Sequence, residues 1–243
     1  PAFARDAGRF VEIPAFRSRN IDPVHVVIWL PPGYDAGRQR YGVVYMHDGQ
    51  NLFFRERSNF DKVWAADKAM AAQKRPWIIV GIDQPGPARF RQYTPQAIAE
   101  RASPAFRAKI DAMAAGPLTG DAYLRFIVDE LKPAIDRDYR TRPDRAHTAI
   151  VGSSMGGLIS CYALARYPAV FGRAACVSTH WPLANPADVG PFNGEVVALW
   201  SGFLRDTLGA PRGRRLWLDH GTATLDAAYA PYQQGIDAEL ERL

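Results

Sequence analysis

The chain has 243 residues, and 47% of them are apolar, which is enough to bury one sizeable core. Thirty Lys and Arg stand against 25 Asp and Glu, a net charge of +5, and the basic residues are spread along the chain without a dense block. This argues against a nucleic-acid-binding protein. No run of 18 apolar residues occurs, so no membrane span is expected. We expect a single domain over residues 1–243 and leave its oligomeric state open.

Two features of the sequence leave alternatives open. The first residue is Pro1, not Met, which fits a processed leader and export to the periplasm or beyond, but equally fits a cytoplasmic protein with an arbitrary start. The only two cysteines, Cys161 and Cys176, can form one disulfide or remain buried thiols.

Six short apolar runs predict strands that are buried on both faces. In chain order they span residues 25–30, 42–46, 77–82, 146–151, 174–178 and 215–219. Longer helical patterns lie between several of them. This alternation is typical of an α/β fold, with a mostly parallel sheet covered by helices on both sides.

The clearest helix prediction covers residues 121–135. Apolar side chains recur on one face of this segment, at Leu124, Ile127, Val128, Leu131 and Ile135. We expect Asp121 to cap the start of the helix and Pro133 to kink or shorten it. The tail, residues 224–243, is also predicted to be mainly helical, with an interruption near Pro231.

Two long segments, 84–120 and 182–213, show no pattern clear enough to assign. Each follows a predicted strand. Both are therefore expected above the carboxyl ends of the strands, where open α/β sheets bind ligands.

The strongest chemical signal is the stretch Gly152-Ser153-Ser154-Met155-Gly156. Only Ser154 has glycine two residues before and two residues after it, so it matches the G-x-S-x-G pattern of a nucleophilic serine. Its context is a predicted strand followed by a helical pattern, as that motif requires. Small flanking residues let strand and helix pass close together and leave the hydroxyl exposed at a strained turn. A plain glycine-rich turn is the alternative.

A nucleophilic serine of this kind needs donors for the oxyanion. The loop after the strand at 42–46 begins with His47, Asp48 and a glycine, and this places a main-chain N–H toward the site. By position we assign the two donors to the N–H groups of Gln50 and Met155. The alternative is an ordinary Asp-Gly turn with solvated His47 and Asp48 side chains.

Four stretches now resemble a known family. They are WLPPGYDAGRQRYGVVYMHDGQNLF, IIVGIDQPGPARFRQYTP, AIVGSSMGGLISCYALARYPAVFGRAACVS and LDHGTATLD. Over roughly residues 20–230 the sequence is similar to the putative-esterase family of α/β-hydrolases. That family includes enterochelin-type siderophore esterases, feruloyl and acetyl-xylan esterases, S-formylglutathione hydrolases and mycolyl transferases. The resemblance implies the α/β-hydrolase fold and a Ser–acid–His mechanism without metal or organic cofactor.

The resemblance also implies where the acid lies. The family's acid follows the strand that here precedes DHGTATLDAAY, which favours Asp226. Many relatives carry the acid nearer the Gly-Thr pair, where this chain has Ala223 and Thr224. Asp219 is the alternative, although it falls inside the predicted strand.

The family's histidine should follow one more strand after the acid, and no histidine follows Asp226 in this sequence. We expect the last strand and the catalytic histidine to lie beyond Leu243. Otherwise the base is lost or replaced. His47, His180 and His220 all fall near strand ends, and His220 is the best substitute, although a hydrogen-bonded turn residue is the commoner explanation.

The predicted reaction is hydrolysis of a small-molecule carboxylic ester through an acyl-enzyme on Ser154. Arginines and aromatic residues follow the strands, and from these we take Arg91 and Trp181 as substrate contacts. Such a lining favours an aromatic or carbohydrate ester over a siderophore lactone. The alternatives are an acyltransferase on the same scaffold and a non-catalytic binding module that has lost its catalytic base.

Overall fold

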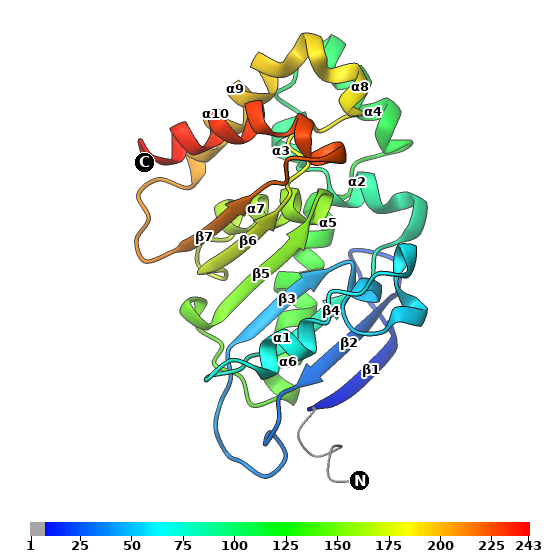
Figure 1. Cartoon of the computed structure of the whole chain (residues 1–243), viewed down its shortest axis with the longest axis vertical. Helices are drawn as coiled ribbons and strands as arrows, with labels where there is room; N and C mark the ends of the chain where they lie inside the picture. The colour runs from blue at the N-terminus through cyan, green and yellow to red at the C-terminus, as the bar shows by residue number, and fades with distance from the viewer. Residues whose placement is uncertain (1–7) are drawn as a thin grey trace.

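A seven-stranded sheet organises the computed structural model, which describes residues 8–243 except for the side chain of Phe60. The strands lie in the order β1-β2-β4-β3-β5-β6-β7 (Figure 1). Their bounds are Arg9–Phe16 (β1), Val24–Leu30 (β2), Val43–His47 (β3), Ile78–Ile82 (β4), Thr148–Ser153 (β5), Arg173–Val177 (β6) and Arg215–Asp219 (β7). β1 and β2 run antiparallel to their neighbours, and the strands from β4 to β7 are parallel. The predicted α/β class with a mostly parallel sheet is confirmed.

The six predicted strands all form, with ends shifted by at most two residues. The strand that sequence reasoning missed is β1, RFVEIPAF. Its side chains alternate between partly buried and exposed positions, because it lies at the edge of the sheet. It carries Pro14, and it has no continuous apolar run of the kind that marked the central strands.

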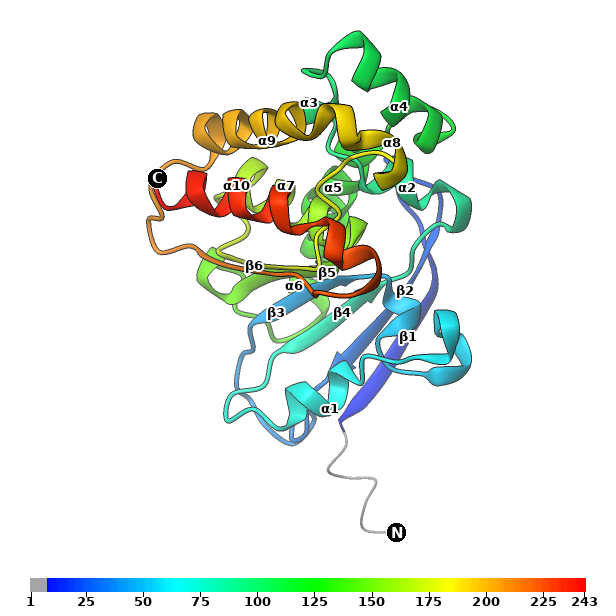
Figure 2. The same ribbon diagram turned by 45° about the horizontal axis from the view of Figure 1, so that its top comes forward.

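The larger core lies on one face of the sheet. Inward side chains of the strands, such as Tyr45, Val80 and Ile150, are buried there against the helices that cover this face. These helices are α5 (Gly120–Arg125), α6 (Lys132–Asp138), α7 (Met155–Arg166), α9 (Asn193–Thr207) and α10 (Ala230–Leu240). Figure 2 shows α7, α9 and α10 on the opposite side of the sheet from α1.

The second face carries a smaller cluster. Trp29, Val44, Met46 and Ile79 are buried there beneath α1 (Ala66–Ala71) and the loop that follows β3. The outer strand β7 is less covered, and its Trp217 side chain is 63% exposed on the surface.

The two unassigned segments fold into short helices at the carboxyl end of the sheet, at the top of Figure 1. They hold α2 (Arg89–Tyr93), α3 (Gln96–Ala99), α4 (Pro104–Ala114), α8 (Pro186–Val189) and α9. One π-helical turn (Phe126–Leu131) and 3-10 turns at Gly49–Asn51, Arg55–Arg57, Asn59–Asp61, Gly86–Ala88, Arg145–His147, Gly190–Phe192 and Thr224–Ala228 complete the elements. Both segments therefore lie where the sequence placed them.

The predicted cap at Asp121 is wrong: Thr119 occupies that position before α5, and the Asp121 carboxylate accepts a 2.7 Å hydrogen bond from the Tyr162 hydroxyl. Pro133 lies in the first turn of α6, and the π-helical turn directly before it interrupts the regular α-helix without ending the helical run. The predicted interruption near Pro231 is present, because the 3-10 turn ends at Ala228 and α10 begins at Ala230 with Pro231 in its first turn.

Among residues 8–243, no helix combines the length and the apolar character that a membrane crossing requires.

Candidate active site

Ser154 stands at the turn between β5 and α7 in a backbone conformation that side chains rarely adopt, with φ 56° and ψ −120°. Hydrogen bonds hold the turn on both sides. The Ser154 N–H donates to the Val177 carbonyl at 2.9 Å, and the Ser154 carbonyl accepts from the N–H groups of Leu158 and His180 at 3.0 and 3.2 Å. The Ser154 residue is partly exposed at the surface. The strain is therefore maintained by its surroundings, as at many functional turns.

The glycines around Ser154 are required by close packing. A Cβ atom on Gly152 would lie 2.6 Å from the main-chain carbon and oxygen of Gly156, so the two glycines of the motif face each other. A Cβ on Gly157 would lie 2.8 Å from the Thr179 hydroxyl. The strand and the helix can pass this close only because those side chains are absent.

The loop after β3 packs against the same turn. Asp48 adopts a left-handed conformation with φ 55°, and the chain then forms the turn Gly49–Asn51. A Cβ on Gly156 would lie 3.2 Å from His47 Cβ and 3.3 Å from an Asp48 carboxylate oxygen, so this loop touches the first turn of α7.

The two proposed oxyanion donors come from these adjoining segments. Within residues 8–243, neither the Gln50 N–H nor the Met155 N–H has a hydrogen-bond acceptor. The side chain of Gln50 holds the loop in place, because its carbonyl oxygen accepts the Gln84 N–H at 3.2 Å. The donor role of both groups stays a prediction, although the arrangement leaves them available for it.

A buried ion pair stabilises the loop. Arg89, from α2, donates two hydrogen bonds to the two Asp48 carboxylate oxygens, at 2.6 and 2.8 Å. The guanidinium carbon also lies 5.2 Å from the centre of the Tyr93 ring. Burial lowers the pKa of Arg89, but the hydrogen bond and the charge of Asp48 outweigh it and leave the pKa raised. Asp48 is thus paired inside the protein and not solvated.

His47 is part of the same buried layer. Its Nδ1 lies 2.7 Å from the Tyr123 hydroxyl. Burial, together with the nearby positive charge of Arg89, lowers the pKa of His47 to about 3. The imidazole is therefore neutral at ordinary pH, and it supports the loop from within the core.

Asp226 and Asp219 both lie near the carboxyl end of β7, but their oxygens are used differently. One carboxylate oxygen of Asp226 accepts from the Ser178 hydroxyl at 2.8 Å and from the Gly221 N–H at 3.1 Å. The other oxygen has no partner among the described residues. In Asp219, the last residue of β7, each oxygen is already bonded, one to the Ser178 N–H and the other to the Trp217 indole. The free oxygen favours Asp226 as the acid.

Tyr229 and His180 are polar side chains beside the turn at Ser154. The sequence analysis named His180 as one of three histidines near strand ends, whereas Tyr229 was not among the predicted site residues. Burial raises the pKa of Tyr229, and the neighbouring Ser154 side chain opposes that rise. The Tyr229 hydroxyl also lies 2.9 Å from His180 Nδ1, and His180 Nε2 lies 3.0 Å from the Ala184 carbonyl oxygen. One feature of the sequence could have pointed to Tyr229: it lies three residues after Asp226, the predicted acid.

The other histidines do not reach the serine. His220 Nδ1 faces the carbonyl of the next residue, Gly221, at 2.9 Å, as a turn residue would. His25 and His147 pair with acidic side chains elsewhere on the molecule. Across residues 8–243, no histidine ring hydrogen-bonds directly to the Ser154 side chain.

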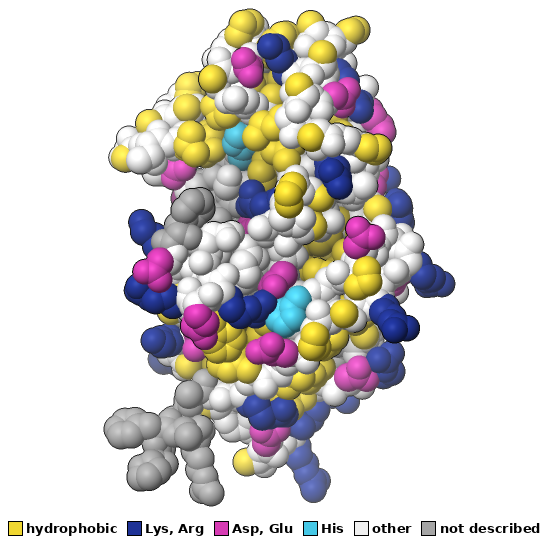
Figure 3. All heavy atoms as spheres, turned by 90° about the vertical axis from the view of Figure 1, so that its right-hand side faces the viewer, with side chains coloured by type: hydrophobic (Ala, Val, Ile, Leu, Met, Phe, Trp, Pro, Cys, Tyr) yellow, Lys and Arg dark blue, Asp and Glu magenta, His cyan; other side chains and the backbone are white. Residues whose placement is uncertain are grey.

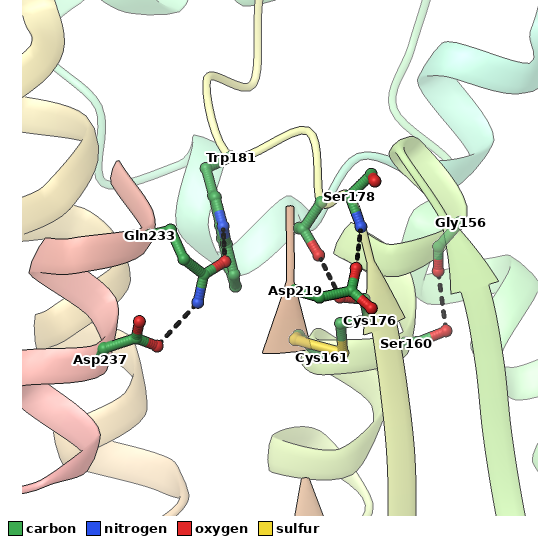
Figure 4. The surroundings of a disulfide bond; sticks show 10 residues. Gly156, Ser160, Cys161, Cys176, Ser178, Trp181, Asp219, Gln233 and Asp237 are labelled. Carbon is green, nitrogen blue, oxygen red and sulfur yellow. Dashed lines mark hydrogen bonds between the residues drawn. A yellow bond between two sulfur atoms is a disulfide. The ribbon is translucent and has the colours of Figure 1, made fainter. Parts of the chain in front are cut away.

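One of the two predicted substrate contacts needs correction. Trp181 is 1% exposed, and its indole N–H donates to the Gln233 side chain at 2.9 Å, so it is a core residue with no surface to offer a ligand (Figure 4). Arg91 lines a surface hollow together with His25, Asp83 and Thr119, and its role as a substrate contact stays a prediction.

A disulfide lies beneath the site. Cys161 of α7 and Cys176 of β6 are joined, so the helix that begins at the serine is tied to the neighbouring strand (Figure 4). No group of three or more potential metal ligands occurs within the part of the chain that the structure describes. On the face seen in Figure 3, Lys and Arg alternate with Asp and Glu without forming a continuous basic field.

The fold is shared with solved proteins of low sequence identity, esterases among them. The BES protein of Bacillus cereus superposes with a TM-score of 0.67 at 17% identity, covering 96% of this chain and 82% of that one. A mutant feruloyl esterase module of Clostridium thermocellum, complexed with sinapinate, gives a TM-score of 0.61 at 18% identity, covering 96% and 74%. At these identities the likeness concerns the fold.

The family follows from the sequence itself. The chain belongs to the family described as "Putative esterase", which matches residues 20–235. It is also similar to the "Uncharacterized protein YbbA" of Bacillus subtilis (strain 168), with 26% identity over 162 residues, or 66% of this chain. The chain spans 58% of the length of that relative.

Proposed function

We propose that this protein hydrolyses carboxylic esters, with Ser154 as the nucleophile of an acyl-enzyme mechanism. The observation that carries the proposal is the strained turn at Ser154, which adjoins a loop and a helix whose Gln50 and Met155 N–H groups have no hydrogen-bond acceptor within residues 8–243. Membership of the esterase family supports the same chemistry.

In the proposed reaction the Ser154 oxygen attacks the ester carbonyl while its proton passes to a histidine base. The main-chain N–H groups of Gln50 and Met155 stabilise the oxyanion, and the alcohol leaves with the proton from the base. Water then attacks the acyl-enzyme by the reverse proton transfers and releases the acid. We assign Asp226 as the carboxylate that orients this histidine.

The substrate is proposed to be an ester of an aromatic acid or a carbohydrate. One structural neighbour is a feruloyl esterase module, and feruloyl esters are aromatic. In this chain the Phe90 ring in α2 packs edge-on against the His180 ring, whose main-chain N–H is bonded to the Ser154 carbonyl, and we propose Phe90 as a contact for such an acyl group.

The proposal is tested with the adjacent serines of the motif. A fluorophosphonate probe should label Ser154 in the encoded protein, and Ser154→Ala should abolish labelling and lower hydrolysis of a nitrophenyl ester by about 10³-fold or more. Ser153→Ala is the matched control and should retain both. Equal hydrolysis by the Ser154→Ala variant and the unchanged protein would remove Ser154 from the mechanism.

A further inference from the structure

A hollow at the amino ends of the parallel strands has the charge of a ligand site, and we propose that it binds a small polyanion with several clustered phosphate or carboxylate groups. Its volume is about 450 Å³. It lies at the opposite end of the sheet from the candidate active site and from the helices at the top of Figure 1. We call it the basic hollow; its lining is Gln39, Arg40, Tyr41, Gly42, Lys74, Arg75, Pro76, Trp77, Arg142, His147 and Arg173.

The fold gathers the positive charges of the basic hollow from distant parts of the sequence. Among the described residues that line it, five are Lys or Arg and none is acidic. Arg40 precedes β3, Lys74 and Arg75 precede β4, Arg142 precedes β5, and Arg173 begins β6. These four strands are parallel, so they start at the same edge of the sheet and bring their cations together there.

Three of these cations are exposed and have no counter-ion bonded to them. The side chains of Lys74, Arg75 and Arg142 make no hydrogen bond or ion pair within residues 8–243. The nearby carboxylate of Asp144 does not line the hollow, and it lies 2.8 Å from His147 Nδ1. The hydrogen bond from His147, more than the charge of Arg142, lowers the pKa of Asp144. One carboxylate that is already bonded leaves most of the positive charge uncompensated.

The backbone around the basic hollow is held by hydrogen bonds between its segments. Tyr41 and Thr141 form a parallel bridge. The Tyr41 N–H donates to the Arg140 carbonyl at 2.9 Å, and the Arg142 N–H donates to the Tyr41 carbonyl at 2.7 Å. The Arg40 guanidinium adds a bond of 3.2 Å to the Thr141 carbonyl. Arg40 and Arg142 therefore lie on adjoining segments whose relative position is fixed.

Trp77 gives the hollow an apolar wall and orients a further arginine. A Cβ on Gly42 would lie 2.5 Å from the Trp77 ring, so the ring rests directly on the backbone. The guanidinium carbon of Arg173 lies 5.3 Å from the centre of this ring, and its Nε–H donates to the Ala146 carbonyl at 2.9 Å. The two terminal nitrogens of Arg173 have no acceptor in the part of the chain that the structure describes. A guanidinium that is held in this way loses little freedom when it binds an anion.

A second hollow of similar size shows what a neutralised arginine cluster looks like in this protein. Its volume is about 500 Å³, and its lining includes Arg17, Arg19 and Arg137 together with Glu130 and Asp138. Arg137 donates to both carboxylate oxygens of Asp138 at 2.8 Å, and Arg19 lies 3.5 Å from Glu130. The carboxylates that balance those arginines belong to the protein itself, whereas the basic hollow contains none.

This difference indicates the chemistry of the ligand. Anionic oxygens accept strong, charge-assisted hydrogen bonds from Arg and Lys, and the planar fork of Arg matches phosphate and carboxylate groups. A ligand with several such groups can contact several of the five cations at once. The volume of the basic hollow falls within the range of about 300–1,000 Å³ that is usual for small-molecule sites. A bounded hollow of this size favours a small molecule over a polymer.

The test titrates the whole protein with tripolyphosphate and, separately, with citrate by isothermal titration calorimetry at low salt. We expect one site per chain, and the tighter of the two probes should bind at least about tenfold more tightly than monophosphate. Tighter binding of tripolyphosphate assigns phosphate ligands, and tighter binding of citrate assigns carboxylates.

Three variants locate the site. Arg142→Gln and Lys74→Gln should each weaken binding of the tighter probe about three- to tenfold. Both side chains are exposed and make no hydrogen bonds within residues 8–243, so these changes should leave the fold intact. Arg17→Gln is the matched control, because it removes the same charge from an exposed arginine of the neutralised hollow. It should stay within about twofold of the unchanged protein, since salt screens charges at that separation.

Three results would overturn the proposal. The first is the absence of saturable binding for both polyanions. The second is an equal loss of affinity in Arg17→Gln and Arg142→Gln, which would mean that the probe responds only to net charge. The third is tighter binding of a single-stranded oligonucleotide than of tripolyphosphate, which would assign the surface to a polymer. None of these measurements uses ester hydrolysis, so a failure of the proposed function would leave them unchanged.

Discussion

The two sides of Ser154 are built in different ways. On the side of the loop that follows β3, which carries the proposed oxyanion donor, His47 and Asp48 are nearly inaccessible, and Arg89 and Tyr123 hold them from inside the protein. On the acid side, Asp226 lies in an exposed 3-10 turn and is held by two hydrogen bonds, from Ser178 and Gly221. The first side belongs to the core, whereas the second is a local turn at the rim.

Because of this difference, substitutions on the two sides should differ in how much they affect folding stability and how much they affect the reaction. A change in the buried loop leaves an unpaired charge inside the protein and so affects folding as well as the position of the Gln50 N–H. A change in the exposed turn alters a carboxylate whose loss the fold tolerates. Variants in the buried loop should therefore lower both stability and activity, whereas variants in the exposed turn should lower activity alone.

The largest effect on activity is expected from Asp226→Asn. Asparagine keeps an oxygen for Ser178 and Gly221 but removes the charge that would orient and stabilise a histidinium, so kcat/KM should fall about 10³- to 10⁴-fold. Thermal unfolding should change little. Both quantities can be measured on the same preparation with a nitrophenyl ester and a melting curve.

Asp219→Asn is the matched control for this prediction, because Asp219 also lies at the end of β7 and also bonds to Ser178. It should cost little activity, since both of its oxygens have structural partners. A large loss in Asp219→Asn with a small one in Asp226→Asn would exchange the two assignments.

On the oxyanion-loop side, Asp48→Asn should lower the free energy of unfolding by about 2–4 kcal/mol, because it leaves the Arg89 guanidinium partly buried without its counter-charge. Asparagine suits the left-handed backbone at this position, so the loss reports the charge and not strain. Urea denaturation gives the free energy, and activity should fall with it as the loop shifts.

Asp35→Asn provides the comparison. Asp35 makes the same two-pronged contact with Arg9 at 2.9 and 3.0 Å, but both side chains are exposed. Water and salt screen such a pair, so its removal should leave stability nearly unchanged. If the two variants lose equal stability, burial is not what makes the Asp48–Arg89 pair important.

Much of the fold, and the centre of the candidate site, could be predicted from local patterns in the sequence. Continuous apolar runs marked the six strands from β2 to β7, and the spacing of Gly152 and Gly156 around Ser154 located the strained turn, since close packing there excludes side chains. The edge strand β1 had no such run and was missed.

The paired polar groups could not be predicted, because their partners meet only in the folded chain. Asp48 and Arg89 are 41 residues apart, and His180 and Tyr229 are 49 apart. For the same reason Trp181 was expected to line the pocket, although its actual partner is Gln233, 52 residues later. Sequence identifies a polar residue near a strand end, and only tertiary packing decides whether it faces substrate or a partner.

The smallest effect concerns pH, and it uses one histidine from each side of the serine. Burial lowers the pKa of His47 to about 3 and that of His180 to about 4, against an ordinary value near 6.5. The unfolded chain therefore binds protons on these rings at a higher pH than the folded chain does. Their contribution to stability is complete above pH 6.5 and is lost as the pH falls toward those lower values.

Each ring should contribute a slope of about 1.4 kcal/mol per pH unit to the free energy of unfolding once its unfolded form is protonated. Between pH 6.5 and 5, above the range in which most carboxylates titrate, His180→Asn should remove about half of the combined slope. Urea denaturation at several pH values measures it. An unchanged slope in His180→Asn would mean that His180 accepts a proton in the folded protein as readily as in the unfolded chain.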